Sequence, residues 1–286
     1  MTDVTTAVST TESTTATTGV VSTDPATWDE AFRAEVTRVR EVVARLHAEL
    51  PRWELVVWTA GNVSQRIRHA SGDLLVIKPS GVTYDELTPE AMVVCDLTGA
   101  LVEGDRSPSS DTAAHAYTYA HMPEVGGVVH THSTYATAWA ARAEPIPCVL
   151  TMMADEFGGD IPVGPFALIG DDSIGQGIVA TLGGGRSRAV LMRNHGPFTI
   201  GRDAKDAVKA AVMVEEVART VHISRQLGEP TRIPAEQVDS LYERYQYVYG
   251  QGGAVRAPLT VVADDVTPSS STSSSTSSTD TTEDAR

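Results

Sequence analysis

Apolar positions along the chain follow two periodicities, and each predicts its own kind of element. A helical spacing predicts a long helix that opens near Pro25 and ends before Pro51. The same spacing predicts helices over residues 111–121, 134–142, 173–182, 205–227 and 234–247. Short apolar runs predict strands over residues 55–58, 74–77, 92–95, 125–129 and 189–192. Strands interleaved with helices indicate a layered α/β domain.

The two ends of the chain have a different composition from its centre. Residues 1–24 are rich in Thr, Ser and Val and carry no Lys or Arg, and residues 264–286 hold a long Ser/Thr run with acidic residues. Such segments bury too little apolar surface to offset the entropy lost on ordering. We therefore expect two disordered tails around one domain over residues 25–263, which contains neither a linker nor an internal repeat.

Charge and cysteine content narrow the classes of partner and compartment. The 286 residues carry a formal net charge of −15, of which −8 belongs to residues 25–263. An acidic chain is a poor ligand for nucleic acid or for an anionic membrane surface, so we expect neither as partner. Two cysteines make no disulfide framework, and no secretory signal or membrane-spanning apolar run is visible. The expectation is a cytoplasmic protein.

The strongest chemical motif is the run Val128–Ser133, which contains His130 and His132. Residues i and i+2 of a strand point to the same face, so the two imidazoles would lie side by side. His195, at the end of an apolar strand, would be a third imidazole, and three histidines with a carboxylate or water form a credible zinc set. A hydrogen-bonded surface pair is the alternative for the two-histidine motif alone.

Three small polar turns follow predicted strands or precede a predicted helix. They are residues 59–64, 78–81 and 107–111. Serine hydroxyls and backbone N–H groups at a helix start suit a phosphate, although each turn alone is ordinary turn chemistry. Neither a dinucleotide-binding glycine motif nor a P-loop is present.

Asp111 and the remaining histidines carry weaker signals. Asp111 is expected in the first turn of a helix, where a carboxylate complements the helix dipole, or as the fourth ligand of a metal. His115 lies one turn further along the same helix. The other histidines are expected to be solvated or packed without a functional role, and they are His47, His69, His121 and His222.

Five blocks in this order resemble the class II sugar-phosphate aldolase/epimerase superfamily (AraD/adducin-like), and most closely its L-ribulose-5-phosphate 4-epimerases. The blocks are TAGNVS (59–64), VIKPSGV (76–82), SPSSDTAAH (107–115), GVVHTHS (127–133) and NHGPF (194–198). They span most of residues 30–251. The resemblance implies a three-layer α/β/α fold with a mixed, largely antiparallel sheet, and a homotetramer with active sites between subunits.

The resemblance also assigns roles to residues. It makes His130, His132, His195 and Asp111 ligands of Zn²⁺ or another divalent ion such as Mn²⁺. It makes Asp155 and Tyr249 the two acid/base residues, which reach a neighbouring subunit's zinc site. The phosphate of a sugar phosphate would be held by seven residues, which are Gly61, Asn62, Lys78, Ser80, Gly81, Ser109 and Ser110.

The activity that the resemblance implies is interconversion of L-ribulose 5-phosphate and D-xylulose 5-phosphate by retro-aldol cleavage and re-addition, a step of arabinose catabolism. In the aldolase branch a Glu stands at the Asp111 position, so Asp111 favours the epimerase. Two departures bear on substrate preference, since residues 240–243 lack a histidine found in some epimerases, and Met152 and Met153 stand where another can occur. The alternatives are a fuculose- or rhamnulose-phosphate type aldolase, a decarboxylase, and an adducin-like binding module without activity.

Overall fold

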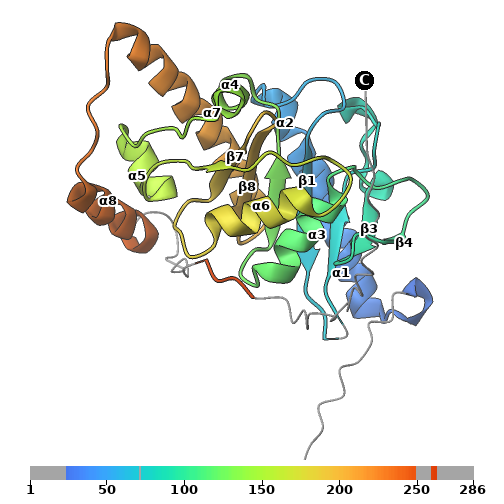
Figure 1. Ribbon diagram of the computed structural model, residues 1–286. Coiled ribbons are helices and arrows are strands. Elements are labelled where there is room, and N and C mark those ends of the chain that lie inside the picture. The colour runs from blue at the N-terminus through green and yellow to red at the C-terminus, as the bar shows by residue number, and fades with distance from the viewer. Residues whose placement is uncertain (1–23, 71, 249–258, 263–286) are drawn as a thin grey trace, which may run out of the picture.

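A mixed eight-stranded sheet organises the computed structural model, which describes residues 24–70, 72–248 and 259–262 (Figure 1). The strand order across the sheet is β4-β3-β2-β1-β5-β8-β7-β6. All neighbours are antiparallel except β6 and β7, which are parallel. The strands are β1 Asn62–Ile67, β2 Leu74–Ile77, β3 Val93–Asp96, β4 Leu101–Glu103, β5 Gly127–His130, β6 Val163–Gly164, β7 Ala189–Met192 and β8 Gly196–Gly201.

Helices cover both faces of this sheet. Figure 1 shows α3 and α6 crossing one face, while α1, α4 and α7 pack on the other, and α5 packs against α8 beside the sheet. The α-helices are α1 Glu30–His47, α2 Glu49–Arg52, α3 Thr112–His121, α4 Thr134–Arg142, α5 Thr151–Phe157, α6 Ser173–Leu182, α7 Ala204–Leu227 and α8 Ala235–Val248. Three short 3-10 helices complete the described elements, at Pro25–Thr27, Tyr84–Glu86 and Pro89–Ala91.

The two-residue period of the strands explains the three layers. In β2, Leu75 and Ile77 point into the core under α3 and α6, whereas Leu74 and Val76 point into the core under α1. All four side chains are buried, as expected for a central strand covered on both faces. The predicted three-layer α/β/α fold with a largely antiparallel sheet is therefore confirmed.

Most predicted elements are present, and the errors have local causes. Strands 74–77 and 189–192 and helices 134–142 and 173–182 have the predicted bounds. Residues 55–58 are not a strand, because the chain turns there and Trp58 adopts a left-handed φ of 58°. The strand lies instead at β1, whose first three residues belong to the segment 59–64 that was predicted to be a turn. Pro25 begins a 3-10 helix, and α1 begins only after Asp29, whose carboxylate caps it.

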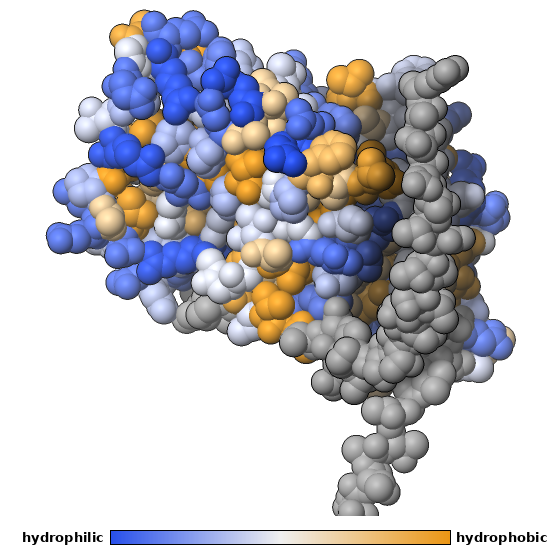
Figure 2. All heavy atoms as spheres, in the orientation of Figure 1, coloured by the Kyte–Doolittle hydropathy of each residue, from blue (hydrophilic) through white to orange (hydrophobic). Residues whose placement is uncertain are grey.

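The predicted disordered tails fall almost entirely outside the described residues, as does Tyr249. Among the described residues, no helix is both long and apolar enough to cross a membrane. The face drawn in Figure 2 is hydrophilic around the outer end of α7, and its hydrophobic residues gather in smaller patches.

Candidate functional site

The register of the sheet places three residues abreast where β5 ends. His130, the last residue of β5, pairs with Asn62 of β1 on one side and with Phe198 of β8 on the other. The His130 ring stacks on Phe198, with ring centroids 4.1 Å apart. This packing, together with the pairing on both sides, fixes the position of a fully buried imidazole.

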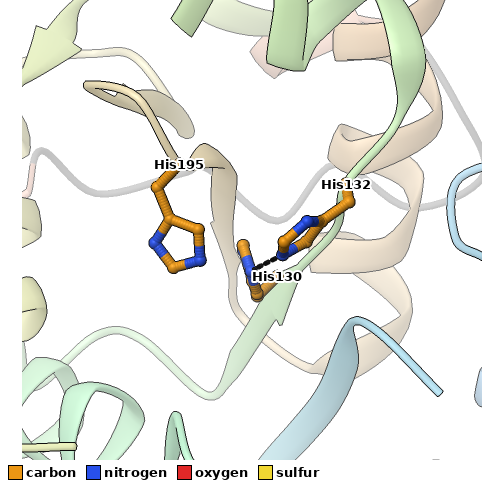
Figure 3. Close-up of side chains that lie close together, drawn as sticks. All are labelled: His130, His132 and His195. Carbon is orange, nitrogen blue, oxygen red and sulfur yellow. Dashed lines mark hydrogen bonds between the residues drawn. The ribbon is translucent and has the colours of Figure 1, made fainter. Parts of the chain in front are cut away.

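His132 and His195 reach the same point from two loops (Figure 3). One ring nitrogen of each histidine lies within 4.8 Å of the others. The Nε2 atoms of His130 and His132 are 2.9 Å apart. The structure thus brings together the three histidines predicted as metal ligands, although His132 lies two residues beyond the strand. His195 lies in a hairpin between β7 and β8, so Gly196 and Pro197 belong to a strand rather than to a terminal turn.

Local backbone features aim these rings at one another. In the β7–β8 hairpin Asn194 has a left-handed φ of 59°, a conformation that Asn tolerates better than most residues. Glu215 of α7 accepts hydrogen bonds from the backbone N–H groups of Tyr135 and Ala136, each at 2.9 Å. Its carboxylate therefore caps α4, which begins directly after the two-histidine motif.

The hydrogen bonding of His130 leaves a lone pair on its Nε2, the atom that lies 2.9 Å from His132 Nε2. Its Nδ1 lies 3.1 Å from the Pro197 carbonyl oxygen, which only accepts, so Nδ1 carries the proton. Burial lowers the pKa of His130 to about 3, and burial also lowers the pKa values of His132 and His195. Neutral imidazoles whose second nitrogen is held by a carbonyl are what zinc sites use. The donor set therefore fits a divalent metal.

Asp111 lines the same cavity as the histidines and does not cap the helix that it precedes. It occupies the N-cap position of α3, yet its carboxylate makes no capping hydrogen bond. Instead Oδ2 accepts a hydrogen bond of 2.7 Å from Asn62 Nδ2, and buried Oδ1 has no partner among the described residues. Burial would raise the pKa of Asp111, but His130, His115, Asn62 and His195 together hold it below its usual value.

The predicted phosphate residues line one cavity with the metal residues. This cavity has a volume of about 260 Å³, and eleven of the thirteen predicted site residues line it. These are Gly61, Asn62, Lys78, Ser80, Gly81, Ser109, Ser110, Asp111, His130, His132 and His195. The two serine turns are joined by backbone hydrogen bonds, from Ser80 N to Ser107 O and from Ser109 N to Lys78 O.

Lys78 supplies positive charge from behind this cavity. Its side chain is almost fully buried, and Nζ donates a 2.6 Å hydrogen bond to the carbonyl oxygen of Thr59. Burial lowers the pKa of Lys78, while Asp111 acts in the opposite direction. Lys78 therefore braces the 59–61 loop and places a cation next to the serine turns.

Asp155 does not line the cavity of its own chain. It lies on α5, a helix that the hydrophobic pattern alone does not predict, and its backbone oxygen accepts a 3.3 Å hydrogen bond from Gln246 of α8. Burial, with Glu156 beside it, raises the pKa of its carboxyl group, although Arg244 opposes this. The location away from the histidines leaves the expected role across a subunit interface as a prediction, and Tyr249 stays untested with it.

The cavity has contributors that sequence reasoning gave no role. Ile169, from the loop after β6, lines it although 55% of its side chain is exposed. Nothing in the local sequence marks Ile169 as a cavity residue, because the apolar run 166–169 to which it belongs lies in a loop and shows neither a helical nor a strand period. The ring of Phe198 and the carbonyl of Pro197 lie in the NHGPF block, but only the sheet register shows that they support His130.

Comparison with protein families agrees with this geometry. Residues 41–222 match the family model described as the Class II Aldolase and Adducin N-terminal domain. The chain belongs to this family. A solved L-fuculose 1-phosphate aldolase is 28% identical, with a TM-score of 0.66, and the match covers 73% of this chain and 97% of that one.

Two further solved structures extend the comparison. YgbL from Klebsiella pneumoniae, described as a putative aldolase/epimerase/decarboxylase, is 29% identical with a TM-score of 0.62, over 72% of this chain and 98% of the other. An aldolase II superfamily protein from Pseudomonas syringae shares the fold, with a TM-score of 0.63 at 22% identity over 76% of this chain and 86% of that one. The family thus covers the whole of the described site, from β1 to β8.

Proposed function

We propose that this class II aldolase family member is a zinc-dependent epimerase that interconverts L-ribulose 5-phosphate and D-xylulose 5-phosphate. The observation that carries the proposal is the pairing of Asp111 with Asn62 beside the three histidines. Because Asn62 holds one oxygen of this short carboxylate, Asp111 is suited to act as a fixed metal ligand. A mobile base would need freedom that this hydrogen bond removes.

The metal would be held by His130, His132, His195 and Asp111, and Mn²⁺ is a possible substitute for Zn²⁺. A divalent ion bound there acts as a Lewis acid that stabilises the negative charge developing on the ketose when its C3–C4 bond breaks. The neutral imidazoles and one carboxylate leave the site with a net positive charge once the ion is present. An anionic sugar phosphate can therefore bind although the chain as a whole is acidic.

The chain's own groups would hold the phosphate in the same cavity. Ser80, Ser109 and Ser110 offer hydroxyl donors, and the N-terminus of α3 offers backbone N–H groups. Lys78 adds a positive charge. Because little water surrounds its buried side chain, its attraction to a bound phosphate would be weakly screened. Anchoring the phosphate would keep the cleaved aldehyde in the site while it rotates to present its other face.

Proton transfer would come from Asp155 and Tyr249 of a neighbouring subunit in a homotetramer. Asp155 is not among the residues that line the cavity, and Tyr249 lies outside the described residues. Burial raises the pKa of the Asp155 carboxyl group, which makes it better suited to hold a proton than a free carboxyl group. One group would take the C4 hydroxyl proton and the other would return a proton on the opposite face. Replacement of either should lower kcat without releasing zinc.

An aldolase is the second candidate, favoured by the 28% identity to an L-fuculose 1-phosphate aldolase. A single set of assays separates the two. The zinc-loaded protein is incubated with L-ribulose 5-phosphate and, separately, with L-fuculose 1-phosphate, and D-xylulose 5-phosphate and dihydroxyacetone phosphate are measured. Formation of D-xylulose 5-phosphate alone supports the epimerase, and net release of dihydroxyacetone phosphate supports the aldolase.

Metal dependence is tested independently of the substrate. A chelator should abolish the activity, and Zn²⁺ should restore it. His132→Asn should lose both bound metal and turnover while the fold persists, because His132 is an exposed side chain outside the core. Full activity in a metal-free preparation would exclude the proposed mechanism.

A further inference from the structure

A buried polar network lies behind the cavity and has no role in the mechanism above. It consists of Ser64 on β1 with His115 and Tyr119 on α3, and none of the three is exposed. Ser64 Oγ lies 2.7 Å from His115 Nδ1 and 2.7 Å from the Tyr119 hydroxyl. We call these three residues the Ser64 network. Polar groups buried between a helix and a sheet are costly unless they are hydrogen-bonded.

The geometry of α3 directs His115 towards Asp111. Helical side chains tilt towards the N-terminus, so a residue four positions later covers the turn that contains the earlier one. Asp111 and His115 are separated by four positions, and each influences the pKa of the other. His115 Nε2 and Asp111 Oδ1 are both buried and both without a hydrogen-bond partner among the described residues.

Hydrogen-bond direction determines which nitrogen of His115 carries the proton. Burial keeps the ring neutral by lowering its pKa to about 4, so it has one N–H. If Tyr119 donates to Ser64 and Ser64 donates to His115 Nδ1, the proton of His115 is on Nε2. The reverse order would place a bare nitrogen lone pair beside the Asp111 carboxylate. Electrostatics therefore favours the Nε2–H form.

We propose that His115 is a positioning residue for Asp111, with its Nε2–H held towards the carboxylate by Ser64 and Tyr119. Asn62 fixes Oδ2 of the carboxylate from β1, and His115 orients the same group from α3. Two restraints from two elements would set the plane of the carboxylate before it meets the metal. The inference rests on the metal site of the proposed function. Loss of such outer contacts typically weakens metal binding 10- to 100-fold.

A matched pair of substitutions separates this role from simple packing. An asparagine amide can replace Nδ1 and a glutamine amide can replace Nε2. His115→Asn therefore keeps the bond to Ser64 and loses the donor near Asp111, while His115→Gln does the opposite. The zinc dissociation constant is measured by competition with a chromophoric chelator, together with the Tm of the metal-free protein.

We expect His115→Asn to bind zinc about tenfold or more weakly and His115→Gln to stay within about threefold of wild type. Wild-type zinc affinity in His115→Asn, or equal losses in both variants, would overturn the inference. Absence of zinc binding in the wild type would instead overturn the proposed metal site, so the two failures are distinguishable.

The tautomer gives a test that needs no variant to fold. ¹⁵N-labelled histidine in the wild-type protein reports by NMR which nitrogen of His115 carries the proton. We expect the Nε2–H form both without metal and with zinc bound. A proton on Nδ1 would overturn the inference whatever the variants show.

Discussion

His47 is a buried histidine whose ring nitrogens are both used only in its neutral form. It has no exposed surface, its Nδ1 donates to the Val43 carbonyl at 2.8 Å, and its Nε2 accepts the backbone N–H of Val63 at 3.0 Å. A proton added to Nε2 would face that N–H. Burial lowers the pKa of His47 to about 3, with Lys78 and His115 acting in the same direction and the Val43 carbonyl opposing them.

The lowered pKa makes folding stability depend on pH. In the unfolded chain a histidine titrates near pH 6.5, so below that pH the unfolded state binds a proton that the native state rejects. The contribution of His47 is complete above about pH 6.5 and is lost as the pH falls towards 3. At 1.36 kcal/mol per pH unit, the free energy of unfolding falls by about 2 kcal/mol between pH 7.5 and 5 on account of this group.

Comparison with a variant isolates His47 from the other buried histidines. His47→Gln keeps an amide donor and an acceptor but does not titrate. Urea unfolding of both proteins is followed at pH 7.5 and pH 5.0 in the presence of a chelator. We expect the variant to be less stable at pH 7.5, and this difference to shrink by about 2 kcal/mol at pH 5.0.

A stability difference that is the same at the two pH values would show that His47 does not cause this pH dependence. His222→Gln, at an exposed position on α7, is the control for replacing a surface histidine. The result also bears on the site, since Val63 adjoins Asn62, the residue that holds Asp111.

Three further predictions concern the supports of the site. Glu215→Gln should lower the free energy of unfolding, measured with urea, by about 2 kcal/mol, because it weakens the carboxylate cap of α4. The control Glu216→Gln, on the exposed face of α7, should change this free energy by under about 0.5 kcal/mol. Lys209→Met should cost about 2–3 kcal/mol in the same assay, since it removes the cation 2.6 Å from buried Glu156, and exposed Lys205→Met is its control. Gly175→Ala should lower Tm, because a Cβ at this position would lie 2.7 Å from Tyr117 Cβ and push α6 away from α3. The expected cost in free energy of unfolding is about 1–3 kcal/mol. An unchanged Tm would contradict the close packing of the two helices.

The parts of the fold that could be predicted from the sequence are those with a regular hydrophobic period. Helix 173–182 and strand 74–77 have unbroken apolar patterns and buried faces, and their bounds are as predicted. Strand β8 was missed because Gly196 and Pro197 signal a turn, and Pro197 is tolerated there only as the second residue of a strand beginning after a hairpin. Strand β6 has two residues, too few to show a period.

Part of the candidate site could likewise be predicted from local sequence, and the rest depends on tertiary structure. The spacing of His130 and His132 in an extended segment already placed their rings side by side, and the structure brings His195 to them. No local rule could bring Ile169 to the cavity or join the turns of Ser80 and Ser109, because both depend on segments far apart in sequence. The proposed role of Asp155 would likewise depend on an arrangement of subunits, which no pattern within one sequence predicts.

Asp111 shows most directly how tertiary structure overrides a local preference. A carboxylate at a helix N-cap usually accepts a hydrogen bond from the first turn, which is worth about 1 kcal/mol. In α3 that bond is absent, and the side chain turns to Asn62 instead. Giving up a cap costs stability, and so does burying a carboxylate oxygen that has no hydrogen-bond partner in the described part of the chain. A cation bound by His130, His132 and His195 would compensate both costs, so Asp111 indicates a metal more strongly than the histidine spacing alone.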